Sequence, residues 1–426
     1  MEALSGRAKA LGWRLLGIPS VMLPVAEAEA LILQAVQPLG TEWVELGSAQ
    51  GRILSQTLCS PQDFPAQPTS SMDGYGVRFA DVQQGIPCDL QVSETIPAGR
   101  APATELQPGQ AVRLYTGSVL PVGADTVVMQ EYTQRLSEAQ VRILKEPQQG
   151  EFVRPQGSFA QQGDPLLERG QRLEGAELAV LAALRQAVVP VFRQPRVAIL
   201  STGDELVPIQ QVPGPGQIVD SNQYGLAALV QTAGGIPVKL GIVPDHPQVL
   251  RETMQQALGA ADVVISSGGV SVGDFDYVEQ LLEDLGGAIF IRSVAIKPGK
   301  PLTVARFSNL HGPDKLYFGL PGNPVSALVT FWRFLHPALR KIGGSLPPYL
   351  EVISATSLKD LHADGKREHY LWGRLHLKSD QAQFQPANSH NSGNLMNLTG
   401  CNGLAVLPIG TTQIPAGSPV QVLRLP

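Results

Sequence analysis

Two short motifs lie in the second half of the chain, AIKPGKP (Ala295–Pro301) and GLPGNPVS (Gly319–Ser326). Apolar, strand-like runs lead into both motifs, so each is expected at the end of a strand. The first motif places two ammonium groups, those of Lys297 and Lys300, on a loop that contains two prolines. Because proline fixes φ, this loop loses little entropy when it orders around a ligand. AIKPGKP is therefore predicted to be a preorganised cationic loop.

The second motif predicts a turn that opens a helix. Asn323 is a favoured N-cap residue, and Pro324 suits the first helical position. The backbone N–H groups of Val325 and Ser326 are expected to be free, because a helix start leaves its first donors unpaired and attracts anions. Together the two motifs indicate an oxyanion receptor. A surface turn and a capped core helix are the alternative for either motif taken alone.

Residues 195–345, which contain both motifs, alternate between strand and helix patterns. Such alternation indicates a doubly wound, mostly parallel sheet with helices on both faces. Ligands of such sheets bind at the carboxyl ends of the strands. The predicted strands are 196–201, 236–243, 262–266, 288–295, 302–307 and 315–319, and the predicted helices begin at Asn222 or cover 247–258, 277–285 and 324–342.

The segments on either side of this α/β region are rich in short strands with Gly or Pro turns between them, which is typical of small sandwiches and barrels. The fold class is therefore multidomain, α/β plus β. The predicted division is an N-terminal extension at 1–21, a linker domain at 22–62 and 146–194, a β-rich domain at 63–145, the α/β domain at 195–345 and a C-terminal β-barrel at 346–426.

The composition excludes several classes of protein. Of the 426 residues, 43% are hydrophobic and 16% are charged, which indicates globular domains. The net charge of -5 disfavours a nucleic-acid partner, since neutralising phosphates needs clustered Lys and Arg. The three cysteines form neither a disulfide framework nor a zinc spacing. These cysteines suggest a reducing compartment, so we expect a cytoplasmic protein. We expect no membrane partner, because the most apolar run, 178–192, is interrupted by an arginine and a proline.

Carboxylates follow the other predicted strands of the α/β region. Glu205 stands in STGDEL (Ser201–Leu206), Asp245 follows the second strand, and Asp276 ends the acidic part of SSGGVSVGDFDY (Ser266–Tyr277). The ends of parallel strands meet at one edge, so these groups are expected near the cationic loop. Carboxylates repel a phosphate unless a cation lies between them, and Mg²⁺ favours that arrangement. The three carboxylates therefore predict a Mg²⁺ site, with helix caps or loop contacts as the alternative for any one.

A glycine-rich loop lies within the same motif. Gly268 and Gly269 allow a phosphate to approach the backbone closely, and Ser266, Ser267 and Ser271 add donors. This loop is predicted to bind a phosphate group of the ligand.

Six motifs follow one another between Ser71 and Ala327, within a resemblance that covers nearly the whole chain from about Met22. They are SMDGY (Ser71–Tyr75), YTGSVLPVGADTVV (Tyr115–Val128), STGDEL, SSGGVSVGDFDY, AIKPGKP and GLPGNPVSA. In this order they resemble the molybdopterin molybdenumtransferase family, which includes MoeA and the gephyrin C-terminal domain. The resemblance implies the last step of molybdenum cofactor synthesis, in which molybdate is inserted into adenylylated molybdopterin and AMP is released.

The same resemblance implies a Mg²⁺-dependent homodimer with a site shared between subunits. The linker domain would form the dimer, and Asp73 and Thr116 would reach the site of the other subunit, although an Asp-Gly pair also suits an ordinary turn. Molybdopterin adenylyltransferase and molybdoenzymes are further expected partners. Glu205, Asp245 and Asp276 are the implied acidic residues. The implied substrate-binding residues are Lys297, Lys300, Pro321, Pro324, Ser326, Arg367 and Ser392.

Two positions depart from the family's pattern. Phe159 stands where an acidic residue usually completes an Arg-x-x-Gly-x-Asp pattern, and Trp372 stands where a second basic residue often follows the Arg367 motif. Two other functions remain open. An adenylyltransferase that makes the AMP-linked pterin would suit the α/β region alone, whereas the β-rich flanks disfavour it. A non-enzymatic scaffold related to gephyrin is disfavoured by the lack of a fused catalytic domain or long linker.

Overall fold

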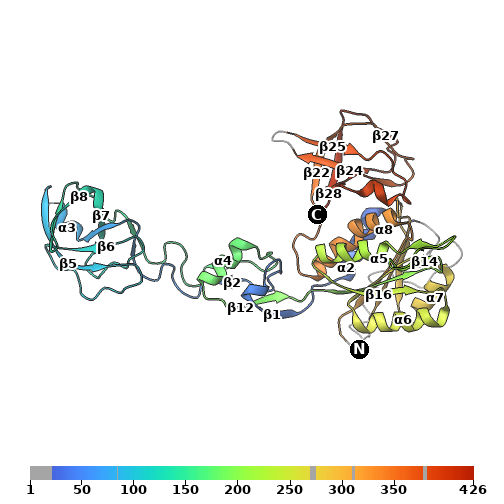
Figure 1. The fold of residues 1–426 in the computed structure, drawn as a ribbon, viewed down its shortest axis with the longest axis horizontal. Coiled ribbons are helices and arrows are strands. Elements are labelled where there is room, and N and C mark those ends of the chain that lie inside the picture. Colours follow the sequence, from blue (N-terminus) through green and yellow to red (C-terminus); the bar gives the residue numbers. More distant parts are fainter. Residues whose placement is uncertain (1–21, 84, 269–274, 309–311, 378–380) are drawn as a thin grey trace, which may run out of the picture. The chain divides into compact units, whose positions relative to one another are not determined.

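The computed structural model of the protein describes residues 22–426 apart from positions 84, 269–274, 309–311 and 378–380. The extension predicted for residues 1–21 lies outside the described residues. No helix in the described part of the chain is long and apolar enough to cross a membrane. The chain divides into two compact units, whose elements are labelled in Figure 1. The first unit comprises Met1–Ser55, Gly170–Glu174 and Val188–Pro426, and the second comprises Gln56–Arg169 and Gly175–Ala187.

The first unit contains the predicted α/β sheet. Its strands stand in the order β16–β13–β17–β21–β20–β18. Neighbours among β16, β13, β17 and β21 are parallel, whereas β20 is antiparallel to both β21 and β18. The loops after β13, β16, β17, β21 and β18 therefore leave the sheet at one edge. The bounds are β13 (Arg196–Thr202), β16 (Ile236–Val243), β17 (Val263–Ser267), β18 (Ala288–Ser293), β20 (Pro301–Phe307) and β21 (Lys315–Leu320), with β14 (Leu206–Val207) pairing β15 (Ile218–Val219) outside the sheet.

Helices cover both faces of this sheet, because successive side chains of a buried strand point to opposite sides. Ile199, Ile265 and Phe318 belong to one core with residues of α5, α8 and α9. Leu200 and Val264 belong to the other core with residues of α6 and α7. The predicted helix 324–342 is helical throughout, but its middle turn is π-helical. The bounds are α5 (Asn222–Thr232), α6 (Pro247–Ala260), α7 (Phe275–Asp284), α8 (Pro324–Thr330), the π segment η3 (Phe331–Leu335) and α9 (His336–Ile342).

The C-terminal strands of the first unit close into a small barrel, as the sequence predicted. Strands β24, β25, β22, β28 and β26 are paired in that order, and β26 pairs back with β24. A short strand, β19 (Ile296–Lys297), joins the edge of this sheet in parallel with β24. The cationic loop is thus tied directly to the barrel. The bounds are β22 (Val352–Ser357), β23 (Leu361–His362), β24 (Glu368–Leu377), β25 (Ala382–Pro386), η4 (Leu395–Leu398), β26 (Gly403–Leu407), β27 (Gln413–Ile414) and β28 (Pro419–Arg424).

Helix α2 (Val25–Ala35) also belongs to the first unit, and its buried residues join the core of α5, α8 and α9. Strand β1 (Thr41–Glu45), which η1 (Leu46–Ser48) follows, pairs in antiparallel with β12 (Val188–Phe192).

The second unit is built on a sheet with the strand order β7–β4–β6–β5–β9–β8. Two short antiparallel pairs, β2 with β11 and β3 with β10, and helix α4 complete it. The finer division of the chain into four domains stays a prediction. The bounds are β2 (Leu58–Cys59), β3 (Thr69–Ser70), β4 (Gly74–Val77), α3 (Phe79–Val82), β5 (Cys88–Ile96), β6 (Gln110–Leu114), β7 (Thr126–Met129), η2 (Gln130–Tyr132), β8 (Thr133–Ser137), β9 (Gln140–Ile143), β10 (Val153–Arg154), β11 (Pro165–Leu167) and α4 (Gly175–Ala183).

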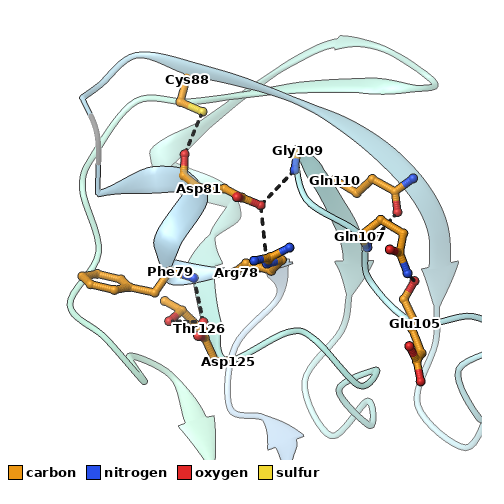
Figure 2. Close-up of polar contacts among 10 residues, drawn as sticks. All are labelled: Arg78, Phe79, Asp81, Cys88, Glu105, Gln107, Gly109, Gln110, Asp125 and Thr126. Carbon is orange, nitrogen blue, oxygen red and sulfur yellow. Dashed lines mark hydrogen bonds and ion pairs between the residues drawn. The ribbon is translucent and has the colours of Figure 1, made fainter.

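Figure 2 shows how two carboxylates of the second unit hold the short helix α3 against its neighbours. The backbone N–H of Phe79 donates to Asp125 Oδ1 at 2.7 Å, and the N–H of Gly109 donates to Asp81 Oδ2 at 2.9 Å. The thiol of Cys88 donates to the carbonyl oxygen of Asp81 at 3.5 Å, and burial raises the pKa of this thiol. These contacts satisfy backbone donors that no strand partner reaches.

Candidate active site

A cavity of about 640 Å³ lies between the cationic loop and the C-terminal barrel. Lys297, Lys300 and Arg367 all line it, and we call it the cationic cavity. The parallel pairing of β19 with β24 sets Lys297 opposite His369, which brings the loop and the barrel strand together. The structure therefore places the three predicted cations in one cavity. Other side chains of this cavity were not predicted as site residues, and they include Lys359, His362, His369 and His390.

Two of these cations and one histidine of the same cavity contact an acidic residue that the sequence did not single out. Asp364 Oδ2 lies 3.4 Å from Lys297 Nζ and 3.5 Å from Arg367 Nη2, and Asp364 Oδ1 lies 3.0 Å from His369 Nε2. The pKa of Asp364 is lowered, first by a hydrogen bond from the backbone N–H of Lys366 and then by His369 and Lys297. Burial lowers the pKa of His369. Asp364 stands three residues before Arg367 in the sequence, and this spacing could have predicted the ion pair.

A second cavity, of about 1010 Å³, lies at the strand ends of the α/β sheet. Glu205 and Asp245 line it together with Gly268, Pro321 and Pro324, and we call it the carboxylate cavity. The cationic and carboxylate cavities adjoin, because Pro301, Asn323 and Ser326 line both of them.

This arrangement agrees with the predicted edge that carries lysines on one side and carboxylates on the other. The predicted metal triad itself is not tested, because the side chain of Asp276 lies outside the described residues. No cluster of three or more potential metal-binding side chains occurs in the part of the chain that the structure describes.

The start of α8 differs from the prediction. Asn323 occupies the N-cap position, but its side chain makes no capping hydrogen bond. The backbone N–H of Val325 is not free, since it donates to the carbonyl oxygen of Ser392 at 3.2 Å. A loop of the C-terminal barrel reaches the helix start and takes this donor. Ser392 itself lines the cationic cavity, and Ser326 lines both cavities.

The glycine-rich loop is only partly described, since Gly269 and Ser271 lie outside the described residues. Ser266 lines neither cavity. Its Oγ lies 2.5 Å from the Tyr317 hydroxyl inside the protein, because alternation along β17 turns it toward the same core as Val264. Ser267 faces the other way and lines the carboxylate cavity, where its Oγ accepts a hydrogen bond from Asn222 Nδ2 at 2.7 Å.

Gly268 has a packing requirement of its own. A Cβ at this position would lie 2.1 Å from the carbonyl oxygen of Thr202, and its φ is +95°. Glycine is therefore needed here by the neighbouring strand, whether or not a phosphate approaches.

Asp73 and Thr116 lie in the second unit, and the structure brings them into direct contact. The backbone N–H and the hydroxyl of Thr116 each donate to Asp73 Oδ1 at 2.8 Å. These bonds lower the pKa of Asp73, the backbone N–H having the larger effect. Gly74, the next residue of SMDGY, is crowded, since a Cβ there would lie 2.1 Å from the carbonyl oxygen of Val128. The predicted approach of this pair to another subunit's site stays a prediction.

The two departures from the family pattern have different surroundings. Trp372 is fully buried, lines the cationic cavity and meets the ring of His390 edge-on at 4.7 Å between ring centroids. Phe159 is 62% exposed and lies 6.2 Å from the ring of Phe64, with the Arg154 guanidinium 5.9 Å from its centroid. Each position is thus occupied by an aromatic ring that packs against a local partner.

Family models match most of the chain in three consecutive parts. Residues 23–184 match the MoeA N-terminal region (domain I and II), 198–341 match a probable molybdopterin binding domain, and 354–425 match the MoeA C-terminal region (domain IV). The matches therefore cover both units and both cavities.

Proteins of similar sequence match this chain over most of its length. A protein of Nostoc sp. named molybdopterin molybdenumtransferase is 53% identical over 391 residues, which cover 91% of this chain and 89% of that protein. The molybdopterin molybdenumtransferase of Bacillus subtilis is 33% identical over 95% of this chain and 94% of its own length. The crystal structure of the molybdopterin biosynthesis MoeA protein from Pyrococcus horikoshii has a TM-score of 0.83, with 29% identity over 95% of this chain and 99% of that one. The chain belongs to the MoeA family of molybdopterin molybdenumtransferases.

Proposed function

We propose that the protein is a molybdopterin molybdenumtransferase, which inserts molybdate into adenylylated molybdopterin and releases AMP. The observation that carries the proposal is the adjoining pair of cavities, one lined by Lys297, Lys300 and Arg367 and the other by Glu205 and Asp245. The names of relatives that match nearly the whole chain support the same activity.

The cationic cavity suits molybdate as a substrate. Its two ammonium groups and one guanidinium favour a tetrahedral dianion, and a guanidinium fork offers two parallel donors to such an oxyanion. Ser326 and Ser392 add hydroxyl donors at the wall between the helix start and the barrel. In this proposal these side chains hold molybdate next to the dithiolene of the pterin, and the barrel supplies Arg367 and Ser392.

The carboxylate cavity suits the phosphates of the pterin nucleotide only with a cation present. Glu205 and Asp245 line one space, which fits the preference of Mg²⁺ for one or two carboxylates with substrate oxygens. Glu205, Asp245 and Asp276 would hold this ion. Bound Mg²⁺ would supply charge neutralisation at the pyrophosphate. The protein's own part is to position the two substrates and to exclude water, and no side-chain nucleophile is invoked.

A turnover assay tests the proposal. The full-length protein is mixed with adenylylated molybdopterin, molybdate and Mg²⁺, AMP is measured by chromatography, and the pterin product is scored by reconstitution of a molybdenum-free molybdoenzyme. We expect AMP release and active cofactor to depend on molybdate. Synthesis of adenylylated molybdopterin from molybdopterin and ATP would indicate an adenylyltransferase instead. Stoichiometric binding without AMP release would indicate a scaffold.

The same proposal extends to assembly. In this extension the protein is a homodimer, and Asp73 and Thr116, which lie in the region that matches MoeA domains I and II, complete the site of the partner subunit. Mixing an Asp73→Ala protein with a Lys297→Ala protein tests it, since a shared site would restore activity at one of two sites in the mixed dimer. Absence of restored activity after confirmed subunit exchange would argue for sites within one chain.

A further inference from the structure

One carboxylate lies among the cations of the cationic cavity without a role in the proposed chemistry. Asp364 Oδ2 stands 3.4 Å from Lys297 Nζ and 3.5 Å from Arg367 Nη2. Its other oxygen, Oδ1, is 3.0 Å from His369 Nε2 and accepts a hydrogen bond from the backbone N–H of Lys366 at 2.9 Å. Three groups that line the cavity therefore converge on one negative charge.

We propose that Asp364 is an internal counter-ion that competes with the oxyanion for Lys297 and Arg367 and so limits the affinity of the cationic cavity for molybdate. The inference rests on the proposed function, because that function makes molybdate the occupant of this cavity. Asp364 is in these terms a positioning and affinity-setting residue and not a catalytic one.

The Asp364 carboxylate contributes little to the stability of the fold. The side chains of Lys297, Asp364 and Arg367 are 47%, 30% and 24% exposed, and exposed ion pairs contribute little to the stability of a fold. The loop that carries Lys297 is also held independently of this contact, since β19 pairs with β24 through the backbone. Removing the charge of Asp364 should therefore leave Lys297 and Arg367 in place.

The same charge has a direct effect on an incoming dianion. Molybdate must take the donors that Asp364 occupies and must approach a like charge, so both effects weaken binding. By contrast, neither Lys300 nor Lys359, which line the same cavity, forms an ion pair among the described residues. One part of the cavity is thus partly neutralised by Asp364, and another part, at Lys300 and Lys359, has no such counter-ion among the described residues. Such a cavity binds the oxyanion less tightly than its full set of cations would allow.

Calorimetric titration of the full-length protein with sodium molybdate, at constant ionic strength and pH 7.5, tests the inference. The Asp364→Asn variant is expected to bind molybdate about three- to tenfold more tightly than the unchanged protein. This gain corresponds to the free energy of one or two exposed ion pairs, which Asp364 no longer forms with Lys297 and Arg367. The Asp364→Glu variant, which keeps the carboxylate, should stay close to the unchanged protein. A gain of affinity separates this role from a merely structural one, because structural damage would weaken binding.

A matched control is available in the same cavity. Asp360 lines it, whereas Asp364 contacts the lining cations without lining the cavity itself. The Asp360 carboxylate accepts hydrogen bonds from the backbone N–H of Ala416 at 2.7 Å and from Gln413 Nε2 at 3.3 Å. The Asp360→Asn variant changes the net charge equally without freeing a cation. The Asp360→Asn variant should change the affinity for molybdate by less than about twofold, because the Asp360 carboxylate forms no ion pair with a cation of the cavity.

The outcomes separate this inference from the proposed function. Unchanged or weaker binding by Asp364→Asn, while Lys297→Ala loses binding, would overturn the counter-ion role and leave the molybdate site intact. Equal tightening by Asp360→Asn would also overturn it, because net charge would then suffice. Equal binding by the unchanged and Lys297→Ala proteins, or no binding by any variant, would overturn the molybdate site itself and the inference with it.

Discussion

The backbone N–H and the hydroxyl of Thr116 both donate hydrogen bonds to a single oxygen of Asp73, each at 2.8 Å. The two residues are far apart in the sequence, but antiparallel pairing of β4 with β6 sets Gly74 opposite Leu114 and brings the adjoining loops together. The two donors lower the pKa of Asp73 and fix the direction of its carboxylate. One edge of the second unit therefore presents an ionised and oriented acidic group.

This pair predicts a separation of activity from stability. Thr116→Val removes the hydroxyl donor and keeps the backbone donor, so the carboxylate should lose one of two restraints. We expect kcat/KM for AMP release to fall about tenfold, on the order of one hydrogen bond to a charged group. The melting temperature should hardly change, because Thr116 is exposed. Thr133→Val, which removes a hydroxyl bonded to the carbonyl of Gln130 in the same unit, is the control and should keep full activity.

The carboxylate cavity predicts a shift in metal requirement. Glu205→Gln and Asp245→Asn each remove one charge from the space that the pyrophosphate would enter. We expect each to lower AMP release about 10²-fold and to raise the Mg²⁺ concentration for half-maximal activity, because fewer charged ligands remain. Glu252→Gln on α6, whose carboxylate accepts a hydrogen bond from Gln248, is a control outside the cavity. Full activity with unchanged Mg²⁺ dependence in both cavity variants would remove these residues from the metal site.

The sheet of the first unit was largely predictable from apolar runs. Strand β16 has the bounds that the pattern predicted, Ile236–Val243, and the other strands of the sheet differ by a few residues at their ends. The central strands β13, β17 and β21 are buried on both faces, so hydrophobicity alone indicates them. The helix 324–342 was predicted as continuous, and the signal for its π-helical turn was Pro337. This proline has no N–H and its ring disturbs the carbonyl four residues earlier, that of Arg333 inside the turn.

The sequence predicted several residues that line the two cavities, but it predicted only part of their orientations and contacts. Motifs at strand ends placed Glu205 and Lys297 at adjoining cavities, because topology determines where the ends of parallel strands lie. The outward direction of Ser267, and the inward one of Ser266, follows from alternation that the sequence contained. The contact between Val325 and Ser392 joins residues 67 positions apart (392 − 325), and no local pattern predicts such a contact.

A half-buried ion pair predicts a stability effect in the first unit. Arg333, in the π-helical turn, bonds both carboxylate oxygens of Glu29 on α2, and its Nε donates to the Tyr370 hydroxyl at 2.8 Å. The Arg333 and Glu29 side chains are only 16% and 18% exposed. Arg333→Met leaves Glu29 without its partner, so we expect a loss of about 3 kcal/mol in the free energy of unfolding. Urea denaturation followed by tryptophan fluorescence measures it.

The double variant Arg333→Met/Glu29→Leu separates the pair from the packing around it. Because both charges are removed together, most of the lost stability should return. No recovery in the double variant would mean that the methylene groups of Arg333, and not the unpaired charge, account for the loss. Tyr370→Phe removes two hydrogen bonds, the one that its hydroxyl accepts from Arg333 Nε and the one that it donates to Glu368, and should cost about 2 kcal/mol. This network also anchors β24, so Arg333→Met should weaken molybdate binding at the neighbouring Arg367.

A buried histidine predicts how the first unit responds to acid. His336 at the start of α9 is 2% exposed, and its Nδ1 has no hydrogen-bond partner. Burial, with a smaller contribution from the charge of Arg340, lowers the pKa of His336 to about 4. The unfolded chain binds a proton at a pKa of about 6.5, so protonation favours unfolding between these values. Stability from this group is present above pH 6.5 and is lost as the pH falls toward 4.

The expected loss between pH 7.5 and pH 5 is about 2 kcal/mol in the free energy of unfolding. Tryptophan fluorescence during urea denaturation reports on the correct unit, because Trp43, Trp332 and Trp372 all belong to the first one. His336→Leu removes the titrating group while keeping an apolar side chain, so its stability should vary with pH by about 2 kcal/mol less. His376→Asn, on an exposed position of β24, should keep the pH dependence of the unchanged protein. An identical pH profile for His336→Leu and the unchanged protein would show that other groups cause the acid sensitivity.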